Sequence, residues 1–168
     1  EMLAKQNPTL IRPAYGFHPE QPLPSAEEEN ALFEWMEHQA QAGQMTAVGE
    51  VGLPYYSRLE ATERGESLDE EGYLRLLERF VIFAANYDLP IILHAVYEDA
   101  PIVCELLERH QIRRAHFHWF KGDEQTVNRM IANGYRISFT PDIAYEDEIQ
   151  KLALDYPASL VMSETDGP

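Results

Sequence analysis

The sequence predicts an α/β fold built on a parallel β-sheet. Short apolar segments alternate with helix-length amphipathic segments along the 168 residues, and this alternation is typical of βα units with parallel strands. The short segments are mostly continuous apolar runs, as expected for strands that are covered on both faces. The alternation fits two architectures, an open doubly wound sheet and a closed barrel.

We expect six strands, each ending where an apolar run stops. They cover residues 10–15, 46–50, 91–94, 115–118, 136–139 and 159–163. Helical periodicity between the strands predicts helices. These cover residues 26–42, about 74–88, 100–110, 124–133 and about 147–156. The stretch from residue 53 to about 68 is long and polar and is expected to be a loop.

Several helix ends carry recognisable capping residues. Ser25 precedes a run of glutamates, which is typical of an N-cap followed by acidic side chains in the first turn. Gly43 and Gly134 follow the last periodic residues of two predicted helices, so they are placed to end those helices.

The composition excludes some functions. With 29 acidic and 13 basic side chains, the net charge is −16, which disfavours a protein that coats nucleic acid. It does not exclude an enzyme that takes in one phosphodiester end, because bound divalent cations invert the local charge. No apolar run approaches the ~20 residues that span a bilayer. The single cysteine, Cys104, lies in an apolar helix pattern and is expected to be buried, and these features favour a cytoplasmic protein.

Four side chains of metal-binding type stand where predicted strands end, namely Glu50, His94, His118 and Asp166. In a parallel barrel these strand ends meet at one rim. Two imidazoles and two carboxylates suit Zn²⁺, Mn²⁺ or a similar ion. The sequence therefore predicts a metal-dependent hydrolase. The alternative for His94 and His118 is a structural one, as buried histidines with backbone partners.

Five motifs around these residues resemble, in this order, the TatD family of metal-dependent deoxyribonucleases. They read Gly16-Phe-His-Pro19, Gly49-Glu-Val-Gly-Leu-Pro54, Leu89-Pro-Ile-Ile-Leu-His94, Phe117-His-Trp-Phe-Lys-Gly122 and Glu164-Thr-Asp166. The resemblance implies a (β/α)₈ TIM barrel with one or two divalent ions (Zn²⁺, Mn²⁺ or Mg²⁺) at its carboxyl rim. It also implies hydrolysis of phosphodiester bonds at DNA ends.

The resemblance also implies roles for individual residues. Glu50, His94, His118 and Asp166 are the implied metal ligands. Glu50 is the candidate to bridge two ions, and Asp166 the candidate to take a proton from the attacking water, so these two are the expected catalytic residues. His18 is expected to contact a substrate phosphate, the alternative being an ordinary loop histidine.

The chain departs from the family pattern in several places. No His-x-His pair precedes Glu50, and the chain stops two residues after Asp166. We therefore expect residues 1–168 to form a single, incomplete barrel domain with the second to seventh of eight strands. Pro54, Val96 and Lys121 replace an Asp, an Arg and a Ser of the motifs. They favour, as an alternative, a same-fold hydrolase of amides, esters or small phosphorylated compounds. A second alternative is a non-catalytic barrel that binds a partner, against which the four intact ligand residues argue.

The remaining candidates lie beside these motifs. Lys121 can restore positive charge for a substrate phosphate, and Glu164 is expected either to contact substrate or to play a structural role. His116 is expected to pack one layer below the rim rather than to bind metal. Four aromatic residues are expected either to line the mouth and stack on a base or to pack in the core. These are Tyr55, Tyr56, Trp119 and Phe120.

Overall fold

A computed structural model of the chain describes residues 2–7 and 9–166. Its strands form one parallel sheet in the order β1-β2-β3-β4-β5-β6. They are β1 (Ala14–Tyr15), β2 (Ala47–Gly52), β3 (Ile91–His94), β4 (Ala115–Phe117), β5 (Arg136–Phe139) and β6 (Val161–Ser163). Strand order follows chain order without reversal, which is the topology of a barrel wall rather than of a doubly wound sheet.

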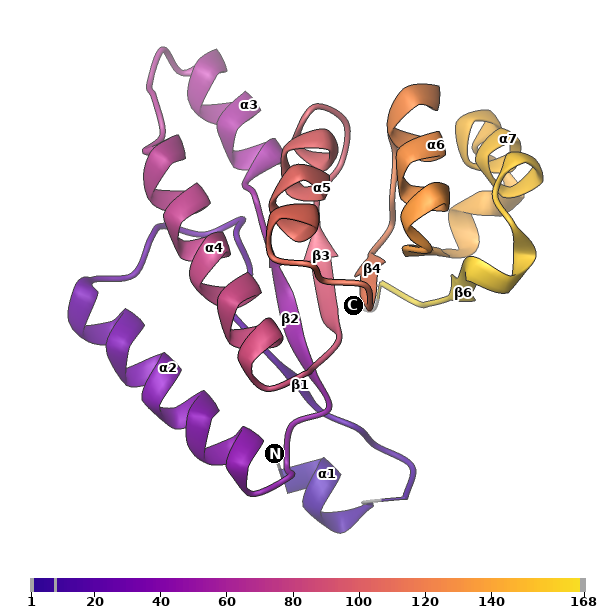
Figure 1. Ribbon diagram of the computed structural model, residues 1–168. Coiled ribbons are helices and arrows are strands. Elements are labelled where there is room, and N and C mark those ends of the chain that lie inside the picture. The colour runs from indigo at the N-terminus through magenta and orange to yellow at the C-terminus, as the bar shows by residue number, and fades with distance from the viewer. Residues whose placement is uncertain (1, 8, 167–168) are drawn as a thin grey trace.

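Helices connect successive strands, and Figure 1 shows α2, α4, α5, α6 and α7 following one another from left to right in chain order. The α-helices are α1 (Met2–Gln6), α2 (Ala26–Gln41), α3 (Tyr55–Glu63), α4 (Glu70–Asn86), α5 (Asp99–Arg109), α6 (Glu124–Asn133) and α7 (Asp147–Asp155). Two short 3₁₀ helices, η1 (Pro141–Ala144) and η2 (Ala158–Leu160), flank α7. Among the described residues, every helix is too short or too polar to cross a lipid bilayer.

The two faces of the sheet differ in chemistry. Alternate strand residues such as Ile91, Leu93 and Phe117 are buried and form one apolar core with helix residues. The residues between them, including His94 and His116, lie on the opposite face, because successive strand side chains alternate. One face therefore supplies the core, and the other carries polar groups toward the carboxyl end of the sheet.

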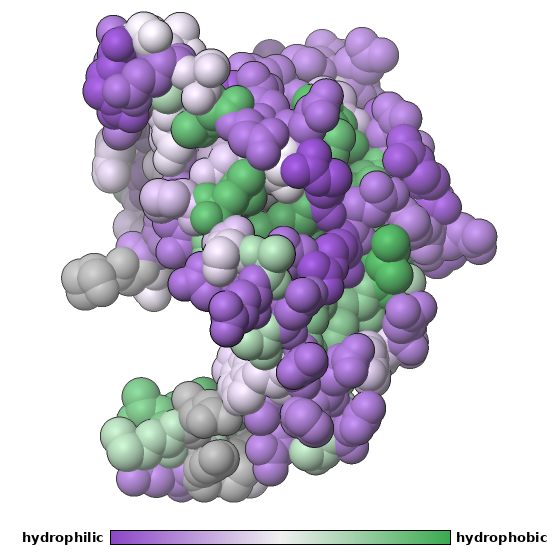
Figure 2. Space-filling view, turned by 90° about the vertical axis from the view of Figure 1, so that its left-hand side faces the viewer, coloured by the Kyte–Doolittle hydropathy of each residue, from purple (hydrophilic) through white to green (hydrophobic). Residues whose placement is uncertain are grey.

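The structure confirms the parallel α/β fold and its TIM-barrel-like class, with differences at element ends. The first strand is confined to Ala14–Tyr15, and the last begins at Val161 because η2 precedes it. Ser25 makes the capping box with Glu28 that starts α2, and Gly134 ends α6 in the left-handed conformation. Cys104 is buried, as expected. The face in Figure 2 is mostly hydrophilic with separate apolar patches, in keeping with the high net charge.

The predicted loop after residue 53 was wrong in part, because α3 occupies Tyr55–Glu63. Only Ala61 of this helix is buried, so it lacks the apolar stripe by which a helix is recognised in sequence. Its first turn is instead held from outside the helix. The Glu20 carboxylate accepts hydrogen bonds from the backbone N–H groups of Tyr56 and Ser57 at 2.8 and 2.7 Å.

Candidate metal centre

Side chains from three neighbouring strands meet at the carboxyl end of the sheet. His18 follows β1, Glu50 lies in β2 and His94 ends β3. The Oε1 atom of Glu50 is 3.3 Å from His18 Nε2 and 3.0 Å from His94 Nδ1. One ligand atom from each of the three lies within 4.8 Å of the others, a spacing at which they could hold one metal ion. The His94 side chain is 8% exposed and that of His18 44%, so the group opens to solvent on the His18 side.

A β-bulge in β2 directs Glu50 into this group. Val48 pairs with Ile91 and Val51 with Leu93, so β2 has one residue more than β3 across this interval. Gly49 has φ +142°, and a Cβ there would lie 2.7 Å from Ile92, so only glycine fits. Bulges redirect side chains and often occur beside functional sites. Gly49 is therefore needed for the backbone conformation that directs Glu50 into the site.

Of the other two predicted ligands, His118 adjoins Glu50 on its second oxygen, and Asp166 adjoins His118. His118 Nε2 is 3.9 Å from Glu50 Oε2 and 3.7 Å from Asp166 Oδ1. The side chain of Asp166 is 57% exposed, and its carboxylate contacts His118. The structure therefore brings Glu50, His94, His118 and Asp166 to one end of the sheet and adds His18 to them, with Asp166 at the margin.

Glu164 fixes the orientation of His118. Its Oε2 lies 2.5 Å from His118 Nδ1, and its Oε1 accepts the backbone N–H of Trp119 at 2.9 Å. With Nδ1 held in this way, Nε2 of His118 is left facing Glu50 and Asp166. A carboxylate on the outer nitrogen is the usual support of a metal-binding histidine.

Glu20 gives His94 the corresponding support, and sequence reasoning missed it. Its Oε1 lies 3.1 Å from His94 Nε2, so Nδ1 of His94 is directed to Glu50. The contact joins residues 74 positions apart, and a local pattern cannot predict such a pairing. The available signal was proximity along the chain, because Glu20 follows the Gly16-Phe-His-Pro19 turn that carries His18.

Charges in the site stabilise one another. Burial alone would raise the pKa of Glu50, but hydrogen bonds from His18 and His94 and the charge of His118 hold it below its usual range. Burial likewise opposes ionisation of Glu20, and contacts with His94 and Ser57 lower the Glu20 pKa to about 2. Both carboxylates are therefore anionic at neutral pH and provide the negative charge that a divalent cation needs.

The histidines respond to these carboxylates. Burial would lower the pKa of His94, but Glu20 and Glu50 together raise it to about 9. The pKa of His118 is also raised, because Glu164 and Glu50 outweigh burial. A metal ion requires a neutral imidazole, so ion binding would release the proton that His94 carries at neutral pH. The donor set of imidazoles and carboxylates thus fits a divalent ion in both type and charge.

The remaining candidates lie around this centre. His116 lies 2.6 Å from Ser138 Oγ through Nε2, and burial lowers its pKa. Val96 is 1% exposed and Phe120 is fully buried, so neither side chain lines the surface of the rim. Lys121 Nζ lies 4.7 Å from the centroid of the Trp119 ring.

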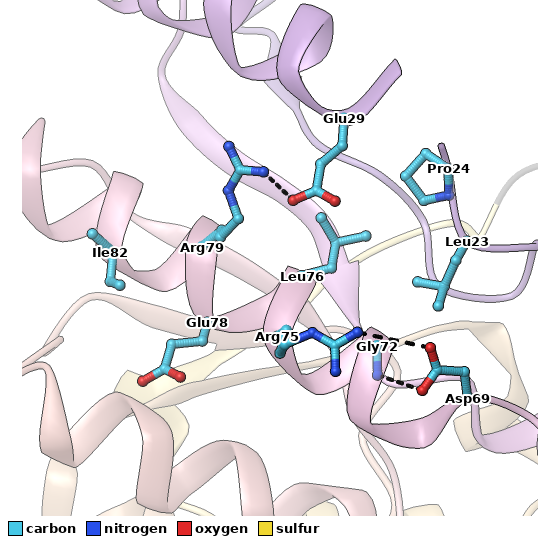
Figure 3. A pocket seen from close by; sticks show the side chains of 10 residues that line it. All are labelled: Leu23, Pro24, Glu29, Asp69, Gly72, Arg75, Leu76, Glu78, Arg79 and Ile82. Atoms are coloured by element: carbon cyan, nitrogen blue, oxygen red, sulfur yellow. Dashed lines mark hydrogen bonds and ion pairs between the residues drawn. The ribbon is translucent and has the colours of Figure 1, made fainter. Parts of the chain in front are cut away.

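A separate groove of about 570 Å³ lies away from this centre, between residues 23–24, α2 and α4. Figure 3 shows Arg79 paired with Glu29 and Arg75 with Asp69, and the remaining charged residue, Glu78, pairs with His110 outside the groove. Asp69 also caps the first turn of α4 through the N–H of Gly72. These interactions account for the charges in the groove without a ligand.

A parallel barrel-like sheet with imidazoles and carboxylates at its carboxyl end defines the class of metal-dependent hydrolases with TIM-barrel-like folds. A family model described as TatD related DNase matches residues 1–168. The chain therefore belongs to the TatD family of metal-dependent hydrolases.

Individual relatives agree with this assignment. The chain is 43% identical to an uncharacterized metal-dependent hydrolase of Haemophilus influenzae over 99% of its own length and 64% of the relative. It is 26% identical to human deoxyribonuclease TATDN3 over 95% of its own length and 58% of that protein. The crystal structure of Escherichia coli YjjV, a TatD homolog, superposes with a TM-score of 0.78 at 25% identity, covering 99% of this chain and 62% of YjjV. The chain thus spans about three fifths of the length of these relatives.

Proposed function

We propose that the protein is a metal-dependent phosphodiesterase that hydrolyses DNA at its ends. The observation that carries the proposal is the convergence of His18, Glu50 and His94 within 4.8 Å, with His118 on the other side of Glu50. Two TatD relatives from Pectobacterium, 27% and 24% identical, are named 3′-5′ ssDNA/RNA exonucleases. Those names support a nucleic-acid substrate for this chain.

We assign Glu50, His94, His118 and Asp166 as metal ligands and add His18 to them. Oε1 of Glu50 faces His18 and His94, whereas Oε2 is the oxygen nearer His118. With its two oxygens toward two groups of ligands, Glu50 would be the residue that holds two ions. Bound there, the ions would polarise a phosphoryl oxygen and lower the pKa of bound water.

The protein side chains have separate tasks in this mechanism. Glu20 and Glu164 hold the imidazoles of His94 and His118 from their outer nitrogens. Asp166 is the most exposed of the four predicted ligands, and in this proposal it would accept a proton from the attacking water. Residues 1–168 then form part of one barrel domain, and the single buried Cys104 favours a cytoplasmic location.

One observation favours a second candidate. Where the family motif carries an Arg that can hold a phosphate bidentately, this chain has Val96, which is 1% exposed. A substrate that carries no phosphate, such as an amide or a carboxylic ester, would not need that guanidinium.

Metal content and a substrate panel test both candidates. Chelator-washed protein, dialysed against Zn²⁺ or Mn²⁺, should retain ions and cleave single-stranded DNA, whereas Glu50→Gln and His94→Ala should lose ions and cleavage together. His38→Ala, an exposed site on α2, is the matched control and should behave like the parent. Cleavage of amides or esters alone would establish the second candidate. Metal-free, inactive parent protein would leave only the binding-module alternative.

A further inference from the structure

Aromatic rings gather at the rim directly beside the metal centre. The Tyr56 ring lies 6.1 Å from that of His94, edge to face. Trp119 follows His118 in the chain and faces Tyr56 at 6.3 Å with 28° between the ring planes. Both rings are partly exposed, whereas the neighbouring Phe120 is fully buried. Of the four aromatic residues that sequence reasoning grouped together, Phe120 therefore lies in the core, and Tyr55 packs edge to face on Tyr56 at 5.1 Å. The other two, Tyr56 and Trp119, form a rim pair.

Trp119 is held at both ends. Its backbone N–H bonds to Glu164 at 2.9 Å, and its indole Nε1–H donates to Asp142 at 2.5 Å. Its φ of +40° lies in the left-handed region that bulky residues avoid, so the surrounding contacts fix a conformation that the residue would not choose. Asp142 is in turn bonded by the hydroxyl of Thr140. A partly exposed indole held in this way makes a rigid platform, and its Nε1–H is already satisfied.

The two rings of the rim pair turn their faces toward one another, with 28° between the planes and 6.3 Å between the centroids. That separation lies within the range of about 4.5–7 Å for offset aromatic pairs. The rings belong to different elements, Tyr56 to the first turn of α3 and Trp119 to the segment after β4. A planar ring in contact with both would require ring planes about 7 Å apart, twice the contact distance of stacked carbon atoms, so the two elements would separate on binding.

A cation lies beside the same platform. Lys121 Nζ is 4.7 Å from the centroid of the Trp119 ring, on a chain whose net charge is −16. A flat apolar surface, a neighbouring ammonium group and an adjacent metal centre together match the parts of a nucleotide, namely its base and its phosphates. Base stacking on aromatic side chains is sequence-tolerant, because every base has a π-face.

We propose that Trp119 and Tyr56 form a subsite that stacks one nucleobase of a single-stranded DNA end, with Lys121 beside the backbone phosphate. This subsite rests on the proposed phosphodiesterase function and states what the enzyme recognises besides the phosphodiester. It favours a base-bearing single strand over a bare phosphodiester, and it compensates for the buried Val96 by holding the substrate through its base.

The test uses Trp119 as its own reporter. The chain has two tryptophans, so Trp35→Phe leaves Trp119 as the only indole. The substitution should not disturb the subsite, because Trp35 packs on Tyr15 away from the rim. The Zn²⁺-loaded protein is titrated with a phosphorothioate adenine trinucleotide and with a trinucleotide of the same backbone that lacks bases. The base-bearing probe should quench Trp119 emission and bind about tenfold more tightly than the abasic probe.

Two substitutions separate stacking from general stability. Tyr56→Leu should remove most of the preference for bases, and Tyr56→Phe, which keeps the ring, should retain it. Tyr87→Leu is the matched control, because Tyr87 packs on Phe83 at the end of α4 and should leave the preference unchanged. Equal affinity for the two probes, or equal losses in Tyr56→Leu and Tyr87→Leu, would overturn the subsite.

Hydrolysis of the unmodified trinucleotide is measured separately, so the two proposals can fail independently. Quenching that depends on bases, without cleavage at any metal concentration, would support the subsite and contradict the phosphodiesterase. Metal-dependent cleavage of base-bearing and abasic strands at equal rates would do the reverse.

Discussion

At the scale of single residues, the centre depends on carboxylates that lie outside the predicted ligand set. Glu20 and Glu164 each occupy the outer nitrogen of one histidine and also accept a backbone N–H, at Tyr56 and Trp119 respectively. Each carboxylate therefore links an imidazole to a loop or helix end near it. Glu20 and Glu164 therefore orient the two histidines and also hold the backbone next to them at the rim.

Replacing Glu20 tests this link. Glu20→Gln keeps the size of the side chain but removes the charge that holds the outer nitrogen of His94, so metal affinity should fall about 10–100-fold. The measurement is Zn²⁺ affinity by competition with a chromophoric chelator. Glu27→Gln is the control, because Glu27 is an exposed acid of α2. Unchanged affinity in Glu20→Gln would show that His94 orients without this partner.

Cys104 gives a prediction that depends on pH. Burial raises the pKa of its thiol from 9.0 to about 12, so the folded protein keeps the thiol protonated where the unfolded chain already loses the proton. Above pH 9 the unfolded state binds fewer protons, so the free energy of unfolding falls as pH rises toward 12 and is unaffected by this group below 9. A thiol reagent at pH 8 should react with Cys104 only in denaturant. Rapid reaction of the native protein would contradict this account.

Sequence reasoning located the residues whose signal is local, and their role as metal ligands stays a prediction. Glu50, His94, His118 and Asp166 all stand where strands or their extensions end, and the structure gathers them there. Glu20 was missed because its partners lie 36 to 74 positions away. His18 was expected to contact a substrate phosphate, and the structure brings it into a group that could hold a metal ion; both roles stay predictions. The location of a side chain at the rim follows from its place at a strand end. The hydrogen-bond partner of each histidine nitrogen depends on tertiary packing instead.

At the scale of elements, the strands were predictable and α3 was not. Buried apolar runs mark β3, β4 and β5 in the sequence almost to the residue. The α3 helix buries little of its surface, and two backbone N–H groups of its first turn donate hydrogen bonds to the Glu20 carboxylate. Propensity and periodicity describe what a segment does alone, and α3 depends on a side chain from another loop.

The contact between β2 and β3 yields an element-scale prediction. A Cβ on Gly52 would lie 1.9 Å from the backbone oxygen of His94, so Gly52→Ala must push the two strands apart. We expect a loss of about 1–3 kcal/mol in unfolding free energy and weaker Zn²⁺ binding, because His94 moves with its backbone. Gly65→Ala is the comparison, since its Cβ meets nothing within 4 Å and bears only the cost of φ +72°. Denaturant unfolding of both variants gives the measurement, and equal losses would contradict the steric argument.

At the scale of the whole molecule, charge and architecture lead to the same site. For the DNA substrate proposed above, the net charge of −16 would oppose approach over long range, so contact would be made where bound cations and Lys121 reverse the local sign. Parallel strands place the side chains that follow them at one end of the sheet. Under that proposal the acidic surface would limit binding elsewhere, and a strand end would enter at the rim.

Metal binding should stabilise the entire fold, because its ligands come from strands or strand ends spread from β1 to β6. Ligands that bind only the folded state add about 2.7 kcal/mol at 100-fold excess over Kd. For a chain of 168 residues, that free energy corresponds to a rise in Tm of about 5–10 °C. Thermal unfolding with Zn²⁺ should therefore occur well above unfolding in chelator, and Glu50→Gln should abolish the difference. A similar Zn²⁺ shift in Glu50→Gln would place the bound ion elsewhere, and the absence of a shift in the parent would show that the five proposed ligands do not act together.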